Sequence, residues 1–182
     1  MTAVLDVRAT FDSLRARCLA GDATATFAMG RLARALSARL RAYHSSLPDY
    51  GVLARLYVEI GYDLAQVHHA AGHDKSALYW VEQMYATTQA LSRVGLGDDD
   101  LRALTLTMYS LVLDAQGSAK RAALMADQAR SLLVTPTTRA RIDGHLVHIS
   151  TLEHIARRGD AGQQSTTKRL IRPSCGDIAL DR

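Results

Sequence analysis

Turn-forming glycines recur along the chain at nearly even intervals, and each follows a stretch with helical patterning. Gly21, Gly72, Gly117 and Gly159 are 51, 45 and 42 residues apart. Glycine commonly ends a helix because it adopts the left-handed backbone conformation at little cost. A period of about 40–50 residues that contains two helices is typical of an α-solenoid. We therefore predict an all-α fold built from repeated helix hairpins.

Apolar residues recur every three or four positions between these turns, which is the period of one helix face. The clearest stripe lies in the third predicted helix and consists of Leu53, Leu56, Ile60, Leu64, Val67 and Ala71. Prolines occur only at positions 48, 136 and 173, so long helices can continue without losing a backbone hydrogen bond. The patterns predict about seven antiparallel helices.

Several helix ends are marked by their residues. Asp22 and Ser118 follow turn glycines and are predicted to cap the next helices, because their side chains can accept a backbone N–H. The run 98–100, three aspartates, is expected in the first turn of the fifth helix, where carboxylates interact favourably with the helix dipole. Gly72 is predicted to be left-handed, and it and its small neighbours are expected to let the third and fourth helices approach closely.

The repeats are predicted to form one domain over residues 1–160. After Gly159 the apolar stripe is lost, and residues 161–182 are polar and contain Pro173. A segment without an apolar stripe has little to bury, so we predict a disordered C-terminal tail.

Composition indicates a cytoplasmic protein that does not enter a membrane. Hydrophobic residues make up 48% of the chain and charged residues 22%, but no apolar run approaches the roughly 20 residues of a membrane helix. The N-terminus lacks the apolar centre of a secretory signal. Cys18 and Cys175 are too few for a disulfide framework or a zinc cluster. The net charge of +4 favours acidic partners without selecting one.

No motif in the chain indicates catalysis, a cofactor or a metal. His69 and His73 have the spacing of a metal pair, but no glutamate follows in the HExxH manner and Gly72 interrupts the helix between them. No GxSxG, P-loop or GxGxxG sequence occurs. Tyr57 and Trp80 are expected to pack between hairpins. We therefore predict a protein that is not an enzyme and has neither catalytic residues nor metal ligands.

The hairpins resemble tetratricopeptide repeats in the residues around their turns. Leu64, Ala65, Gly72 and Ala77 match the leucine, small residue, glycine and alanine of that motif, although Val81 stands where the family has a large aromatic residue. The longer period resembles the C-terminal sensor region of actinobacterial helix-turn-helix regulators. This resemblance implies a regulatory or scaffold role through binding of a protein or peptide, with a link to transcription regulation.

The resemblance also implies a binding site, because the first helix of each tetratricopeptide unit lines a concave groove. Carried onto the third predicted helix, the groove positions are Glu59, Tyr62, Asp63, Gln66 and His69. Their spacing places them on one side of the helix, opposite the apolar stripe. Such a face could bind an extended peptide or a small ligand, with the two carboxylates contacting its cationic groups. The alternative is a simple solvated face.

A second function stays open because the second predicted helix is basic. Arg31, Arg34, Arg39 and Arg41 could contact phosphates, so the alternative function is a small basic nucleic-acid-associated regulator. No motif and no interleaved aromatic residues accompany these arginines, and a solvated face explains them as well. We therefore expect binding of a protein or peptide rather than direct contact with nucleic acid.

Overall fold

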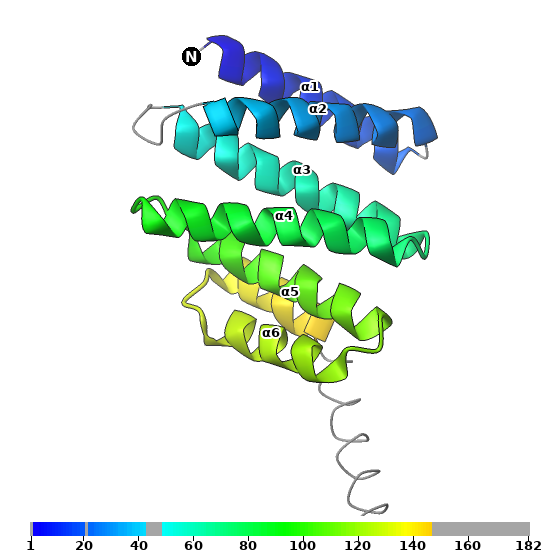
Figure 1. Cartoon of the computed structure of the whole chain (residues 1–182), viewed down its shortest axis with the longest axis vertical. Helices are drawn as coiled ribbons and strands as arrows, with labels where there is room; N and C mark the ends of the chain where they lie inside the picture. Colours follow the sequence, from blue (N-terminus) through cyan, green and yellow to red (C-terminus); the bar gives the residue numbers. More distant parts are fainter. Residues whose placement is uncertain (1, 21, 43–48, 147–182) are drawn as a thin grey trace, which may run out of the picture.

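The computed structural model describes residues 2–20, 22–42 and 49–146, and these residues form a stack of antiparallel helices (Figure 1). The helices are α1 (Thr2–Leu19), α2 (Ala23–Ala42), α3 (Tyr50–Ala70), α4 (Asp74–Arg93), α5 (Asp99–Ala115) and α6 (Ala119–Ser131), and residues 136–146 are helical as well. No strand occurs in these described ranges. The structure confirms the predicted all-α helical repeat, in which each helix packs against its neighbours in the chain.

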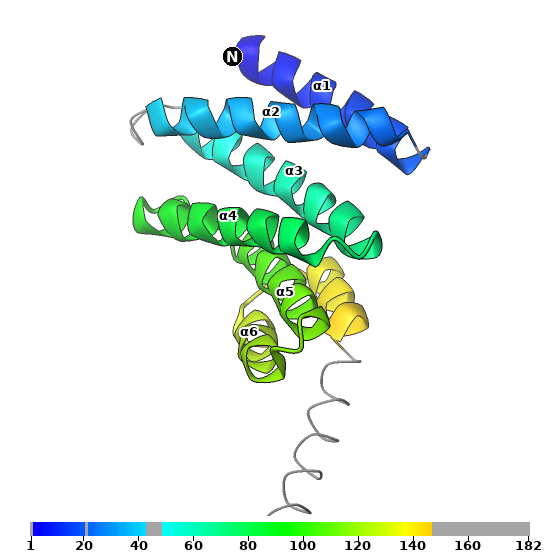
Figure 2. The same cartoon turned by 45° about the vertical axis from the view of Figure 1, so that its right-hand side comes forward.

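The helices form two layers, which Figures 1 and 2 show from two sides. The inner layer consists of α1, α3, α5 and residues 136–146, and α3 contacts both α1 and α5. The outer layer consists of α2, α4 and α6, which make no such contacts with one another within the described residues. The first helices of successive hairpins contact one another and the second helices do not, so the first helices lie on the inner side of the stack.

The turn after α3 has the geometry predicted for Gly72. This glycine has φ of 70°, its N–H bonds to the carbonyl of His69, and the N–H of His73 bonds to the carbonyl of His68. This pair of bonds is the Schellman motif, which satisfies carbonyls at the helix end. The turns at Gly95 and Gly117 have the same positive φ and the same bonding pattern.

The expected close approach of α3 and α4 at Gly72 is wrong. A Cβ atom at Gly72 would meet nothing within 4 Å, whereas one at Gly61 would lie 2.8 Å from Cγ of Met84. Close contact with α4 therefore depends on Gly61 in the middle of α3 rather than on Gly72, and residues 70–72 at the turn are exposed. Gly61 provides the space because it has no side chain to collide with α4.

The core confirms most of the α3 stripe and corrects its end. Leu53, Leu56, Ile60 and Leu64 are buried, but Val67 is 37% exposed and Ala71 is exposed. The last two positions of the predicted stripe are therefore not part of the core. Tyr57 and Trp80 are buried between hairpins as predicted.

Two of the predicted helix caps have different outcomes. Asp22 accepts the N–H of Thr24 at 2.8 Å, which confirms its capping role. Ser118 precedes α6 but makes no capping hydrogen bond through its side chain, so that prediction is wrong. Asp98 was expected in the first turn of α5 with Asp99 and Asp100, but it precedes the helix and caps it by accepting the N–H of Leu101 at 3.0 Å.

Some predictions concern residues outside the described ranges. These are the part of the predicted seventh helix beyond residue 146, the turn at Gly159 and the tail over 161–182. In the described part of the chain, no helix combines the length and the apolar character that crossing a membrane requires.

Candidate functional site

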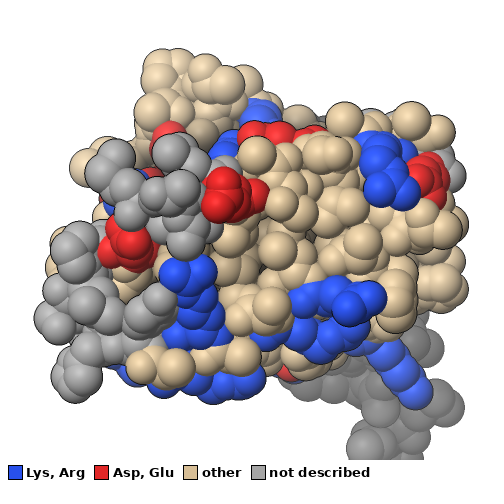
Figure 3. All heavy atoms as spheres, turned by 90° about the horizontal axis from the view of Figure 1, so that it is seen from above, with Lys and Arg blue, Asp and Glu red and all other residues tan. Residues whose placement is uncertain are grey.

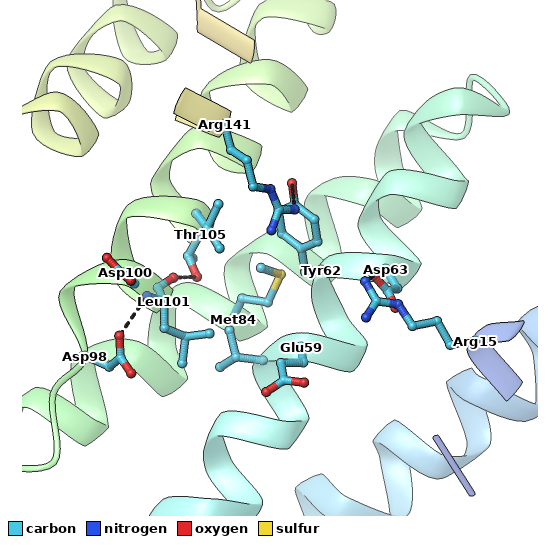
Figure 4. Close-up of a pocket in the computed structure, with 12 residues that line it drawn as sticks. Arg15, Glu59, Tyr62, Asp63, Met84, Asp98, Asp100, Leu101, Thr105 and Arg141 are labelled. Atoms are coloured by element: carbon cyan, nitrogen blue, oxygen red, sulfur yellow. Dashed lines mark hydrogen bonds and ion pairs between the residues drawn. The ribbon is translucent and has the colours of Figure 1, made fainter. Parts of the chain in front are cut away.

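A cavity of about 290 Å³ opens on the inner layer, where α1, α3, α5 and residues 136–146 meet (Figure 4). Its wall combines apolar side chains with four carboxylates and two guanidinium groups. The lining residues are Arg15, Val58, Glu59, Tyr62, Asp63, Met84, Asp98, Asp100, Leu101, Leu104, Thr105 and Arg141. Three of the five predicted site residues therefore line one cavity.

The two predicted carboxylates are held by arginines of α1. Nη1 of Arg8 lies 2.7 Å from Oε2 of Glu59, and Nε of Arg15 lies 2.8 Å from Oδ2 of Asp63. Both guanidinium groups also lie over the ring of the buried Phe11, at 5.7 and 5.9 Å from its centroid. A cationic ligand at Glu59 or Asp63 must therefore share the carboxylate with α1 or displace an arginine from it.

The sequence reasoning missed these arginines, although a signal was present. Arg8 and Arg15 are seven residues apart and Glu59 and Asp63 four apart, so each pair lies on one helix face. The ion pairs follow the same order along both helices, Arg8 with Glu59 and Arg15 with Asp63, as expected for two helices that run in the same direction with matching faces.

Asp63 is the most buried carboxylate with a described partner, since its side chain is only 12% exposed. Burial raises the pKa of Asp63, and the negative charge of Glu59 adds to this effect, while Arg15 and Arg141 oppose it. The pKa is raised because the low-dielectric surroundings disfavour the charged form more than the two arginines stabilise it.

Tyr62 and Arg141 form the wall nearest residues 136–146. The guanidinium of Arg141 lies 5.6 Å from the centroid of the Tyr62 ring, and its Nη2 donates to the phenol oxygen at 3.5 Å. Gln66 donates to the same oxygen at 3.2 Å. Burial raises the pKa of Tyr62 and Arg141 opposes this shift, so the phenol stays neutral and can donate or accept a hydrogen bond.

The acids of α5 form the opposite wall. Asp98 caps α5 and lies 3.8 Å from Nη1 of Arg55. Asp100 accepts both the N–H and the hydroxyl of Thr135 at 2.8 Å, and these bonds, the backbone one first, lower the pKa of Asp100. Asp100 therefore ties the start of the helix over residues 136–146 to α5 and remains charged.

The remaining predicted residues lie outside the cavity wall. Gln66 does not line the cavity but donates a hydrogen bond to Tyr62, which does. His69 is at the end of α3, where its Nδ1 lies 3.6 Å from Oδ1 of Asp74. The rings of His68 and His73 are 6.0 Å apart. Within the described residues, no group of three His, Cys, Asp or Glu side chains is arranged to hold a metal ion.

The cavity therefore offers groups of both charges, a neutral phenol and an apolar floor that includes Met84. Carboxylates and guanidinium groups form strong charge-assisted hydrogen bonds, and guanidinium groups suit carboxylate ligands in particular. This set of groups is suited to recognition of a molecule that carries both charges.

In comparisons with known proteins, no family model matches the chain, and no curated protein or solved structure matches it significantly. The tetratricopeptide resemblance, the link to helix-turn-helix regulators and the site residues therefore stay predictions.

Proposed function

We propose that the protein binds a peptide segment of a partner in the inner-layer cavity and acts as a regulator or scaffold rather than as an enzyme. The observation that carries this proposal is the cavity between three repeat units, with Glu59, Tyr62 and Asp63 of α3 in its wall. Side chains from several repeats converge on it, as expected for an extended binding surface of a stacked-repeat protein.

The charges of the cavity define the peptide that would fit. Asp98 and Glu59 are half-exposed carboxylates that can accept from a lysine, an arginine or an amino terminus. Arg141 is exposed and has no carboxylate within ion-pair distance among the described residues, so it can bind an acidic side chain or a terminal carboxylate. A peptide with neighbouring basic and acidic groups would match both walls.

The first testable prediction is that Arg141→Ala weakens peptide binding without unfolding the protein. The immobilised chain would be used to isolate a partner from its native host, and a synthetic peptide of the bound region would be titrated calorimetrically. We expect the affinity to fall about tenfold or more, which corresponds to about 1.4 kcal/mol. Arg141 is a better site for this test than Asp63, because removal of Asp63 would also break its ion pair with Arg15 of α1.

Lys120→Ala provides the control, because this exposed residue lies on α6 and not in the cavity wall. The control should bind like the unaltered protein. Equal affinity in all three proteins would show that the peptide binds elsewhere and would remove the cavity as the site.

The alternative function, contact with nucleic acid through α2, is supported by the distribution of charge at one end of the stack. Residues 23–42 contain four arginines and no acid, and the end of the molecule seen in Figure 3 carries patches of Lys and Arg, with Asp and Glu beside some of them. Binding in rising salt separates the two functions, since phosphate contacts give a steep salt dependence. An affinity that changes little with salt concentration would favour peptide binding.

A further inference from the structure

A second hollow surface lies on the outer layer, in the crevice between α2 and α4. These two helices run in the same direction with α3 behind them (Figures 1 and 2), and they make no direct helix contact with each other within the described residues. One hollow of about 560 Å³ lies between their first halves, and another of about 220 Å³ lies between their second halves. We call this surface the α2–α4 crevice.

The residues that line the two hollows lie on continuous helix faces. On α2 they include Phe27, Gly30, Arg34, Ser37 and Arg41, whose spacings of three and four residues follow one face of the helix. From Phe27 to Arg41 this face is roughly 21 Å long, at 1.5 Å per residue. A crevice of this length can hold a peptide segment of several residues rather than a single side chain.

Large apolar side chains stand exposed at the wider end of the crevice. Phe27 is 67% exposed and Tyr79 is 49% exposed, and both line the same hollow. The floor beneath them is formed by the buried Leu64 and Trp80. Exposed aromatic residues above an apolar floor are typical of binding hot spots, because a partner that covers them removes a large apolar surface from water.

The charge of the crevice is of one sign. Arg34 and Lys75 line the first hollow and Arg41 the second, and none of the described residues that line either hollow is an Asp or a Glu. The nearby Glu82 of α4 is exposed but does not line them. A partner that covers the aromatic residues while carrying carboxylates would satisfy both the apolar and the charged parts of this surface.

We propose that the α2–α4 crevice binds an acidic segment of a partner protein that inserts apolar side chains beside Phe27 and Tyr79 and places carboxylates on Arg34 and Arg41. The apolar part of the crevice favours a peptide over nucleic acid. Phosphate contacts dominate nucleic-acid binding, whereas this crevice offers few cations and an apolar floor of Leu64 and Trp80 that apolar side chains can cover. The chain's own residues 147–182 contain more basic than acidic side chains, so they do not complement the crevice.

The crevice and the inner-layer cavity lie on opposite layers, so the two proposals can be tested separately. A display library of random peptides of about 14 residues, the length of a helix that spans the crevice, would be selected on the full chain. Enriched peptides would be synthesised, and their binding measured by fluorescence anisotropy. The panel would contain the unaltered protein, Arg34→Glu with Arg41→Glu, Phe27→Ser, Lys120→Glu and Arg141→Ala.

We expect a class of acidic peptides with interspersed apolar residues. Their affinity should fall at least about tenfold in the double charge reversal and in Phe27→Ser, and it should be unchanged in Lys120→Glu and Arg141→Ala. All substituted side chains are exposed, and helical circular dichroism would verify that each variant is folded.

Three results would overturn the proposal. The first is that no acidic class is enriched, or that its binding is the same in the crevice variants. The second is that single-stranded DNA binds and loses affinity in the same variants, which would make the crevice a nucleic-acid surface. The third is a dimer in sedimentation that Phe27→Ser dissociates, which would make a second copy the occupant. Loss of peptide binding only in Arg141→Ala would concern the inner-layer cavity instead.

Discussion

Gly61 and Gly72 both belong to the α3–α4 hairpin, but a side chain would meet different surroundings at the two positions. At Gly72 the difficulty is the backbone, because φ is 70° and the space around the residue is open. At Gly61 the backbone is helical, and the difficulty is the buried Met84, whose Cγ would be 2.8 Å from the new Cβ. Two glycines of one hairpin are thus required for different physical reasons.

A double-mutant cycle with Met84→Ala should separate these reasons. We expect Gly72→Ala to cost about 1 kcal/mol of unfolding free energy, from the left-handed backbone alone, whether or not Met84 is truncated. Gly61→Ala should cost about 1–3 kcal/mol from overpacking, less a gain of up to about 1 kcal/mol in helix propensity. That cost should shrink in the Met84→Ala background, as measured by urea denaturation.

The result would contradict the structure if Gly61→Ala and Met84→Ala were additive. It would also do so if Gly72→Ala showed the coupling instead, since α3 and α4 would then approach at the turn.

At the scale of single helices, the ends of α5 and α6 show how a similar sequence signal can have two outcomes. Asp98 precedes α5 with extended backbone angles, and its carboxylate accepts the N–H of Leu101. Ser118 precedes α6 and has the composition of a cap, but φ and ψ of −88° and 52° accompany no side-chain capping bond. The preceding Schellman turn determines the backbone at Ser118, because its N–H is bonded to the carbonyl of Leu113.

Alanine substitutions at the two positions form a matched pair. We expect Asp98→Ala to lower the free energy of unfolding by about 1 kcal/mol, because an N–H of the first turn of α5 loses its acceptor. Ser118→Ala should change it by less than about 0.5 kcal/mol, as for an ordinary surface position. Thermal melts followed by circular dichroism would measure both, and equal losses would mean that Ser118 does cap α6.

At the scale of the whole molecule, contacts are almost entirely between helices that are adjacent in the chain or one hairpin apart. α1 contacts α2 and α3, and α6 contacts α5, but no contact within the described residues joins α1 to α5 or α6. In such a stack, stability is close to a sum of repeat and interface contributions. A substitution that destabilises one hairpin should therefore leave the stability of distant hairpins nearly unchanged.

Phe11→Ala tests this expectation, because Phe11 is fully buried in the first hairpin. We expect a loss of about 3–5 kcal/mol in the stability of that hairpin. Hydrogen exchange should become faster in α1 and α2 while α5 and α6 keep their protection. A uniform loss of protection along all helices would show that the stack unfolds as one cooperative unit.

The helices and their turns could be predicted from the sequence, because they depend on interactions between residues that are near in the chain. The 3.6-residue period of apolar residues and the left-handed preference of glycine act within a few positions of the chain, so α3, α4 and the Gly72 turn were predictable. The side of α3 that carries Glu59, Tyr62 and Asp63 was also predictable, since helix geometry alone places them together.

Which of these residues meet, and what pairs with them, depends on the packing of the helices and could not be predicted from the sequence. Arg141 reaches Tyr62 from 79 residues away, and Arg8 and Arg15 hold the carboxylates of α3 from 51 and 48 residues away. Likewise, only the packing of α3 against α4 gave Gly61 its role. Such contacts depend on the crossing and spacing of whole helices, which are set by interdigitating side chains that have no fixed separation in sequence.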